Sequence, residues 1–223
     1  RVRCGFHDSF EYEGDWTDNF FDEFESRRGY DLKAFLPALL GNADPEWVKR
    51  IKCDYRQTLS ELHMQEFILP MVSWCHEHDM LLRLQAHGSP GNLLDFYAAA
   101  DIPETEIFAR DQQWDVLKFA SSAANLTGKK LVAAESFTWQ TEHFQTNLDT
   151  LKRSADLLFA AGINHLIYHG APYSPAQAKW PGWLFYAATL FNTNNPLWSD
   201  FPALNDYVTR CQSLLQASSP DQD

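Results

Sequence analysis

Acidic side chains recur in this sequence directly after short apolar stretches. Glu135 is the clearest case, because it follows the apolar run of "LVAAES". An isolated charge at the end of a buried strand is costly, so this carboxylate must either face a site or meet a partner. Carboxylates with perturbed pKa values gather in active sites, and we therefore expect Glu135 to be functional. A structural ion pair is the alternative.

A second group of acids follows the first apolar stretch, in "RVRCGFHDSFEYEGDW". Asp8 and Glu11 lie closest to the predicted strand end, and we expect both to be functional. Glu13 and Asp15 lie further along, and we interpret them as solvated loop residues, because runs of charge usually face water.

The stretch "DIPETEIF" carries two further carboxylates, Glu104 and Glu106. Their spacing of two places both on one side of an extended segment. Together with other oxygens they could hold Ca²⁺, which takes about six to eight hard ligands. The sequence has no EF-hand loop, so a calcium site of that type is excluded.

Histidines and aromatic residues accompany these acids. His87 in "QAHGSPGN" and His169 in "YHGAPYS" each precede a glycine at a predicted strand end. Each is a candidate for hydrogen bonding to substrate, with a structural role as the alternative. Tyr173 follows His169 closely and is a further substrate-binding candidate. Trp139 follows Glu135 and could either stack on a sugar ring or plug a barrel mouth.

The elements that position these residues follow an α/β rhythm, in which apolar stretches alternate with helical patterns. We predict helices at about 55–78 with a kink near Pro70, and at about 111–126, 146–161 and 201–215. The predicted strands are about 2–8, 80–87, 103–108, 130–136 and 163–169.

Each predicted strand ends in one of the candidate residues, and in parallel α/β folds function collects at the carboxyl ends of strands. A closed eight-stranded barrel typically needs about 250 residues. Five strands within 223 residues, beginning inside a strand-like stretch, therefore predict the C-terminal five strands of a TIM-type (β/α)8 barrel, cut from a longer polypeptide. This partial barrel spans 1–216, and 217–223 form a disordered tail. Glu11 and Glu135 then belong to strands three apart and nearly face each other.

Composition excludes several classes of function. Thirty acidic against eighteen basic residues give a net charge of −12, which does not favour binding to nucleic acid. No apolar run reaches the length of about 18 residues that a membrane span needs, so no membrane partner is expected. The sequence also lacks G-x-S-x-G, Walker and G-x-G-x-x-G motifs. Aromatics around paired acids instead suit glycoside hydrolysis, in which one carboxylic acid protonates the leaving oxygen and a second carboxylate activates water or attacks the sugar.

Several motifs in order carry a family resemblance over roughly residues 6–215. They are "HDSFE", "EFESRRGYDLKAFLPALLG", "DYRQTLSELHMQEF", "CHEHDMLLRLQAHGSPGNLLD", "DIPETEIF", "AAESFT", "YHGAPYS" and "PGWLFYAATLFNTNNPLW". With these motifs the sequence resembles the catalytic barrel of glycoside hydrolase family 106, the α-L-rhamnosidases. The resemblance implies a large multidomain enzyme that cleaves α-L-rhamnosyl or related deoxysugar linkages with inversion and carries calcium at the sugar site.

The resemblance also implies roles for individual residues. Glu11 would be the general acid and Glu135 the general base, while Glu106 would assist the base or hold calcium. His87 and His169 would contact the sugar. The implied partners are a rhamnose-containing carbohydrate and the remaining domains of the parent chain. The location stays open, with a periplasmic or secreted one slightly favoured for a bacterial glycan-degrading enzyme.

Two alternatives stay open. A retaining glycosidase with carboxylates on barrel strands 4 and 7 would hold its two carboxyl groups about 5–5.5 Å apart, whereas inversion needs about 6.5–9.5 Å. A carbohydrate-binding remnant without catalysis would use only the aromatics. The segment could also be inactive without the rest of the chain, because missing strands leave sheet edges unpaired.

Overall fold

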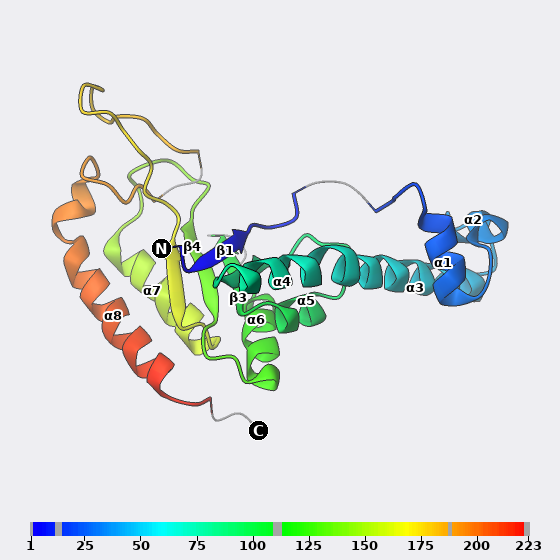
Figure 1. The fold of residues 1–223 in the computed structure, drawn as a ribbon. Coiled ribbons are helices and arrows are strands. Elements are labelled where there is room, and N and C mark those ends of the chain that lie inside the picture. Colours follow the sequence, from blue (N-terminus) through cyan, green and yellow to red (C-terminus); the bar gives the residue numbers. More distant parts are fainter. Residues whose placement is uncertain (1, 12–14, 109–112, 187–188, 221–223) are drawn as a thin grey trace.

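A single parallel sheet organises the molecule, seen here in a computed structural model that describes residues 2–11, 15–108, 113–186 and 189–220. The sheet has the strand order β1-β2-β3-β4-β5, so strands that follow each other along the chain are neighbours. This topology forms a half-barrel (Figure 1) and confirms the predicted α/β class and the five predicted strands. The strands are β1 (Cys4–His7), β2 (Leu81–Gln85), β3 (Ile102–Phe108), β4 (Ala133–Thr138) and β5 (His165–Tyr168).

Helices cover one face of this sheet. Alternation along β2 explains why, since Leu82 and Leu84 are almost fully buried on the helix side while Arg83 and Gln85 point to the other face. The apolar face packs into one core with side chains from the covering helices. These helices are α4 (Leu69–Glu77), α5 (Leu93–Ala99), α6 (Trp114–Thr127), α7 (Leu148–Ala160) and α8 (Phe201–Ala217).

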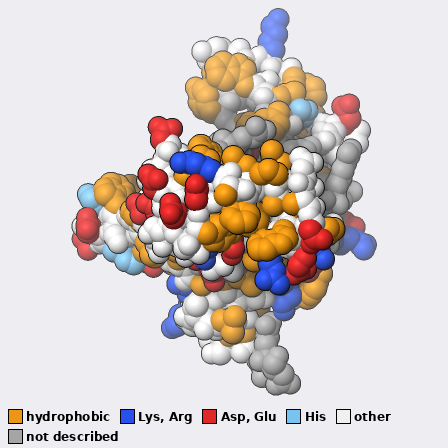
Figure 2. Space-filling view, turned by 90° about the vertical axis from the view of Figure 1, so that its right-hand side faces the viewer, with side chains coloured by type: hydrophobic (Ala, Val, Ile, Leu, Met, Phe, Trp, Pro, Cys, Tyr) orange, Lys and Arg blue, Asp and Glu red, His pale blue; other side chains and the backbone are white. Residues whose placement is uncertain are grey.

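A helical insertion between β1 and β2 has a separate core built on Phe20, Phe24 and Ile51. It lies at the far end of a long helix in Figure 1, and hydrophobic side chains gather on its outer end, which faces the viewer in Figure 2. The insertion comprises α1 (Phe20–Arg28), a 3-10 helix (Leu32–Phe35), α2 (Leu36–Leu39) and the first part of α3 (Pro45–Leu62).

The predicted start of the long helix, at about residue 55, is too late. Helix α3 begins at Pro45, where the Asp44 side chain accepts a hydrogen bond from the Glu46 N–H. An N-cap Asp followed by Pro at the first helical position is a strong signal for the start of a helix. The predicted start rested on hydrophobic periodicity, which does not contain this signal.

The same helix is interrupted by a π-helix, His63–Ile68, immediately before α4. Proline has no N–H to donate to the carbonyl four residues earlier, so Pro70 leaves the Glu66 carbonyl without its usual partner. The irregularity predicted at Pro70 thus occurs in the preceding turn, and π turns of this kind are frequent at functional sites.

The chain after β5 has little regular structure until a 3-10 helix, Pro196–Ser199, leads into α8. Helix α8 continues to Ala217, slightly beyond its predicted end, and the last three residues of the predicted tail lie outside the described residues. Among the helices of the described chain, none combines the length and apolarity required to cross a membrane.

Candidate active site

Polar side chains line the face of the sheet opposite the helices. The strand register explains their convergence, because it aligns Gln85 of β2 with Glu104 of β3 and aligns Glu106 of β3 with Glu135 of β4. Residues aligned in a parallel sheet project to the same side. Four polar side chains from three neighbouring strands are thereby brought together near their carboxyl ends.

Three neighbours hold the Glu135 carboxylate in place. Gln85 Nε2 donates to Oε2 at 2.8 Å, Thr138 Oγ1 donates to Oε1 at 3.3 Å, and His169 Nδ1 lies 3.0 Å from Oε1. The carboxylate keeps 12% of its side-chain surface exposed, so it remains accessible. Partners on three different strands or strand ends therefore fix the orientation of the predicted catalytic carboxylate.

An irregularity in β4 creates one of these contacts. Phe137 has φ of 72°, in the left-handed region that side chains rarely adopt, and the β3–β4 register shifts after the pair of Glu106 and Glu135. In a regular strand Thr138 would point away from Glu135. Here its Oγ1 instead reaches that carboxylate and lies 3.1 Å from His169 Nδ1. Such bulges are frequent beside active sites because they re-aim a side chain.

Glu106 is the direct neighbour of Glu135 and has its own histidine. His87 Nε2 lies 2.9 Å from Glu106 Oε2. Burial raises the pKa of Glu106, the hydrogen bond from His87 opposes this, and the negative charge of Glu135 and hydrogen bonding with it raise the pKa further. Burial and the neighbouring Glu135 carboxylate therefore hold the pKa of Glu106 above the usual value of a glutamate.

Glu104 lies deeper and is fully buried. It accepts a hydrogen bond of 3.0 Å from Gln85 Nε2, and Arg83 Nε lies 2.9 Å from its Oε2. Burial raises its pKa to about 7; Gln85 and Arg83 oppose this, and the negative charges of Glu135 and Asp8 add to it. Glu104 is thus a supporting carboxylate without access to solvent.

The two predicted acids after β1 are both exposed. Asp8 accepts a hydrogen bond from the Ser9 N–H at 2.8 Å, and its charge reaches Glu104, so it lies near the cluster. For Glu11, no hydrogen bond or ion pair with another described residue joins it to the cluster, and its position opposite Glu135 stays a prediction. Glu13 lies outside the described residues, whereas Asp15 is exposed, as expected for a solvated loop.

The two aromatic candidates, Trp139 and Tyr173, differ clearly in how much of their surface is exposed. Trp139 is only 7% exposed, and its ring stacks on buried Phe137 at 5.6 Å within the core. With so little of the residue exposed, its position favours the packing role that the sequence left as the alternative to sugar stacking. Tyr173 is 75% exposed on the chain segment after β5, and His169 faces the Phe185 ring edge-on at 5.0 Å.

The predicted site residues did not include three side chains that contact the cluster, namely Gln85, Thr138 and Arg83. Gln85 shares the inner face with the predicted His87, and that alternation was the available signal. Thr138 could not be found by alternation, because the irregularity at Phe137 reverses its direction.

The predicted calcium ligands were Glu104 and Glu106, and their surroundings fit this ion poorly. Both oxygens of Glu104 already face Gln85 and Arg83, and a neighbouring cation disfavours a second positive charge. Within the described ranges, no three His, Cys, Asp or Glu side chains come together as a metal-binding group.

Comparison with known proteins gives the context of this site. The profile of glycoside hydrolase family 106, described as alpha-L-rhamnosidase, matches residues 1–223. The solved structure of a rhamnosidase from Novosphingobium sp. PP1Y is similar with a TM-score of 0.81 and 30% identity, covering 97% of this chain and 22% of that one. A Formosa agariphila protein named "Putative beta-glucuronidase" is 32% identical over 218 residues, or 94% of this chain and 18% of the relative.

The chain thus spans about a fifth of the length of these two relatives. Both carry names of glycoside hydrolases, and the carboxylates at the strand ends are the groups that glycoside hydrolysis requires. The chain belongs to glycoside hydrolase family 106, the α-L-rhamnosidases.

Proposed function

We propose that this chain, within its full-length protein, hydrolyses α-L-rhamnosyl or related deoxysugar linkages with inversion at the anomeric carbon. The observation that carries the proposal is the partly exposed Glu135 carboxylate at the end of β4, held in one orientation by Gln85, Thr138 and His169. Acid and base catalysis at a glycosidic bond needs one such positioned carboxylate beside the attacking water and a second carboxyl group beside the leaving oxygen. Membership of the α-L-rhamnosidase family supports the choice of sugar.

In this proposal Glu135 is the general base that takes a proton from the attacking water. The contacts with Gln85, Thr138 and His169 hold its carboxylate in one orientation. A catalytic group that is already held in place loses less entropy when the reactive geometry forms. Glu106 lies beside the base on the adjacent strand, and His87 contacts its carboxyl group at 2.9 Å.

The proposed general acid is Glu11, which follows β1 on the other side of the half-barrel. Inversion requires about 6.5–9.5 Å between the acid and the base, because a water molecule must fit beside the sugar. We propose that further strands of the full-length protein complete an eight-stranded barrel around this cluster and exclude bulk water from it.

The reaction and its stereochemistry can be tested on the full-length wild-type protein. Methyl α-L-rhamnoside and a β-D-glucuronide are supplied separately, and the anomer first released is followed by proton NMR. The proposal predicts cleavage of the rhamnoside with initial release of β-L-rhamnose. Initial release of α-L-rhamnose would replace inversion by retention, and cleavage of the glucuronide alone would overturn the proposed substrate.

A further inference from the structure

Four aromatic side chains stand out to solvent on the segment that follows β5. Tyr173, Trp180, Trp183 and Tyr186 are between 61% and 75% exposed, and we call residues 173–186 the aromatic loop. The segment projects beyond the sheet in Figure 1, and orange side chains gather at the top of Figure 2, where it lies. Large exposed aromatic surface on a folded protein usually marks a binding site.

The base of the aromatic loop is held by several hydrogen bonds. Trp183 N donates to Ser174 Oγ at 3.0 Å, and Asn194 Nδ2 donates to the Pro181 carbonyl at 3.2 Å. Gly182 has φ of +87°, and a Cβ there would come within 2.4 Å of Ser174 Oγ. Glycine at this position thus permits a tight turn. The turn carries the neighbouring aromatic side chains and is held by these hydrogen bonds.

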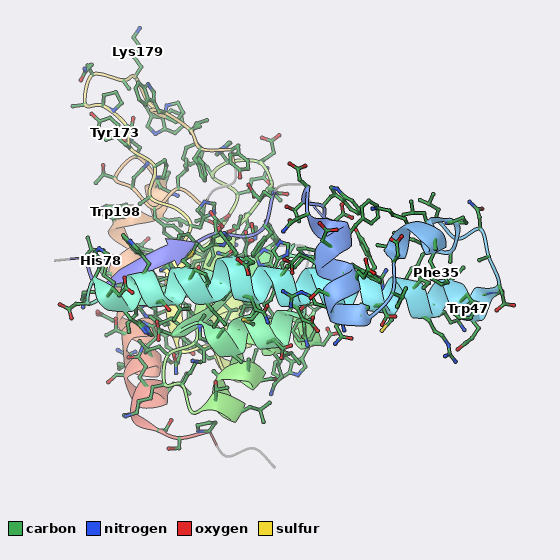
Figure 3. All side chains as sticks on the ribbon, turned by 45° about the vertical axis from the view of Figure 1, so that its right-hand side comes forward. Phe35, Trp47, His78, Tyr173, Lys179 and Trp198 are labelled. Atoms are coloured by element: carbon green, nitrogen blue, oxygen red, sulfur yellow. The ribbon has the colours of Figure 1, made fainter. Side chains whose placement is uncertain are left out.

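The aromatic loop is continuous with the candidate active site. The Phe185 ring contacts His169 at 5.0 Å, and the Phe185 carbonyl accepts a hydrogen bond of 2.8 Å from His143 Nε2. His169 in turn lies 3.0 Å from the Glu135 carboxylate. The exposed Tyr186 ring contacts Phe185 at 4.8 Å, so two side chains, Phe185 and His169, connect the exposed rings to the proposed base. Figure 3 labels Tyr173 and Lys179 on this segment.

We propose that the aromatic loop binds the saccharide units of the substrate that lie beyond the terminal rhamnose, which makes the natural substrate an oligosaccharide or polysaccharide. This inference rests on the proposed function. Sugar rings present C–H faces that pack on the faces of Trp and Tyr, and their hydroxyls can pair with the phenol groups of Tyr173 and Tyr186. A neutral glycan also suits a chain with a net charge of −12.

The chemistry of the aromatic loop favours a saccharide over a packed protein partner. Its large exposed side chains are mainly Trp and Tyr, which combine an apolar ring with a polar atom, and Gln177 and Lys179 add exposed polar groups beside the aliphatic Leu184. A protein core would instead be expected to meet aliphatic residues that interdigitate with its own. Exposed Trp and Tyr side chains on a hydrogen-bonded turn are suited to a flat, hydroxylated ligand.

The test compares two substrates in the full-length protein. Methyl α-L-rhamnoside fills the proposed cleavage site only and has no aromatic aglycone that could stack, whereas a rhamnose-terminated oligosaccharide reaches the aromatic loop. For Trp183→Ala, kcat/KM should fall about tenfold on the oligosaccharide and stay unchanged on the methyl glycoside. Trp74→Ala is the matched control, since Trp74 is 53% exposed on α4, near the opposite end of the strands.

Each outcome bears on the proposal. An equal loss on both substrates, or no loss on either, would overturn it. A fall in melting temperature with an unchanged ratio of the two kcat/KM values would also overturn it, because that result assigns the aromatic loop to packing against another part of the protein.

If the wild type cleaves neither substrate, the proposed function fails while the aromatic loop remains testable by calorimetric titration with the same oligosaccharide. Binding that Trp183→Ala weakens and Trp74→Ala does not would support the loop as a saccharide site. Equal binding by both variants would refute it.

Discussion

Gln85 Nε2 donates a hydrogen bond of 2.8 Å to Glu135 Oε2, so an amide from β2 reaches across to the carboxylate of β4. The same nitrogen donates to Glu104 of β3 at 3.0 Å, and Gln85 is fully buried. One amide group thus separates two acids that would otherwise repel each other, and it fixes the direction of the exposed one.

Replacing Gln85 by Leu should remove this bridge while keeping the volume of the side chain. A hydrogen bond to a charged group is worth about 1.5–3 kcal/mol, so we expect kcat/KM on an α-L-rhamnoside to fall about tenfold to a hundredfold. Gln57→Leu serves as the control, because Gln57 is exposed on α3 and pairs only with nearby Glu61 in the described structure. Equal kcat/KM values for Gln85→Leu and the control would show that the bridge does not position Glu135.

Glu104 should make the stability of this region depend on pH. Its pKa rises to about 7 on folding, so between the unfolded and folded values the folded state binds more protons than the unfolded state. The free energy of unfolding should therefore fall as pH rises from about 4.3 to 7, by about 3 kcal/mol in total. Hydrogen exchange of the β3 amides, corrected for intrinsic rates, measures this free energy at each pH.

The matched variant is Glu104→Gln, which keeps a polar side chain of the same size but does not titrate. Its β3 amides should show a smaller fall in protection between these pH values than those of the wild type. Identical pH profiles would mean that Glu104 does not titrate in this range.

Trp139 should tolerate another aromatic ring but not its removal. Because the ring packs in the core on Phe137, Trp139→Ala should destabilise the protein by about 3–5 kcal/mol, and Trp139→Phe should cost less. Thermal unfolding of the full-length variants measures this difference. If Trp139→Phe were to raise KM for rhamnosides without lowering the melting temperature, a role in sugar stacking would replace the packing role.

The sequence predicted the strands and most of the acids because both depend on local patterns. Glu135 follows an apolar stretch, Glu104 and Glu106 alternate along one extended segment, and parallel strands bring their ends to one edge whatever the details of packing. The helical insertion was predicted less well, since its short helices before α3 have weak periodicity and are stabilised by contacts such as Arg28 with Thr58.

Irregular backbone explains the remaining differences. Trp139 and Glu135 are four residues apart, and regular alternation would place both on the inner face of the sheet. The left-handed Phe137 between them ends that alternation, buries Trp139 and turns Thr138 towards the carboxylate. A bulge of this kind depends on tertiary packing, so single-sequence patterns do not reveal it.

The central claim is that Glu135 is the catalytic base, and the most direct measurement is kcat of the full-length Glu135→Gln variant on an α-L-rhamnoside. Glu142→Gln is the control, since Glu142 is an exposed acid only seven residues away. A positioned general base contributes about 10²- to 10⁴-fold, so kcat should fall by at least about a hundredfold in Glu135→Gln and stay unchanged in Glu142→Gln. A Glu135→Gln enzyme with wild-type kcat would contradict the account.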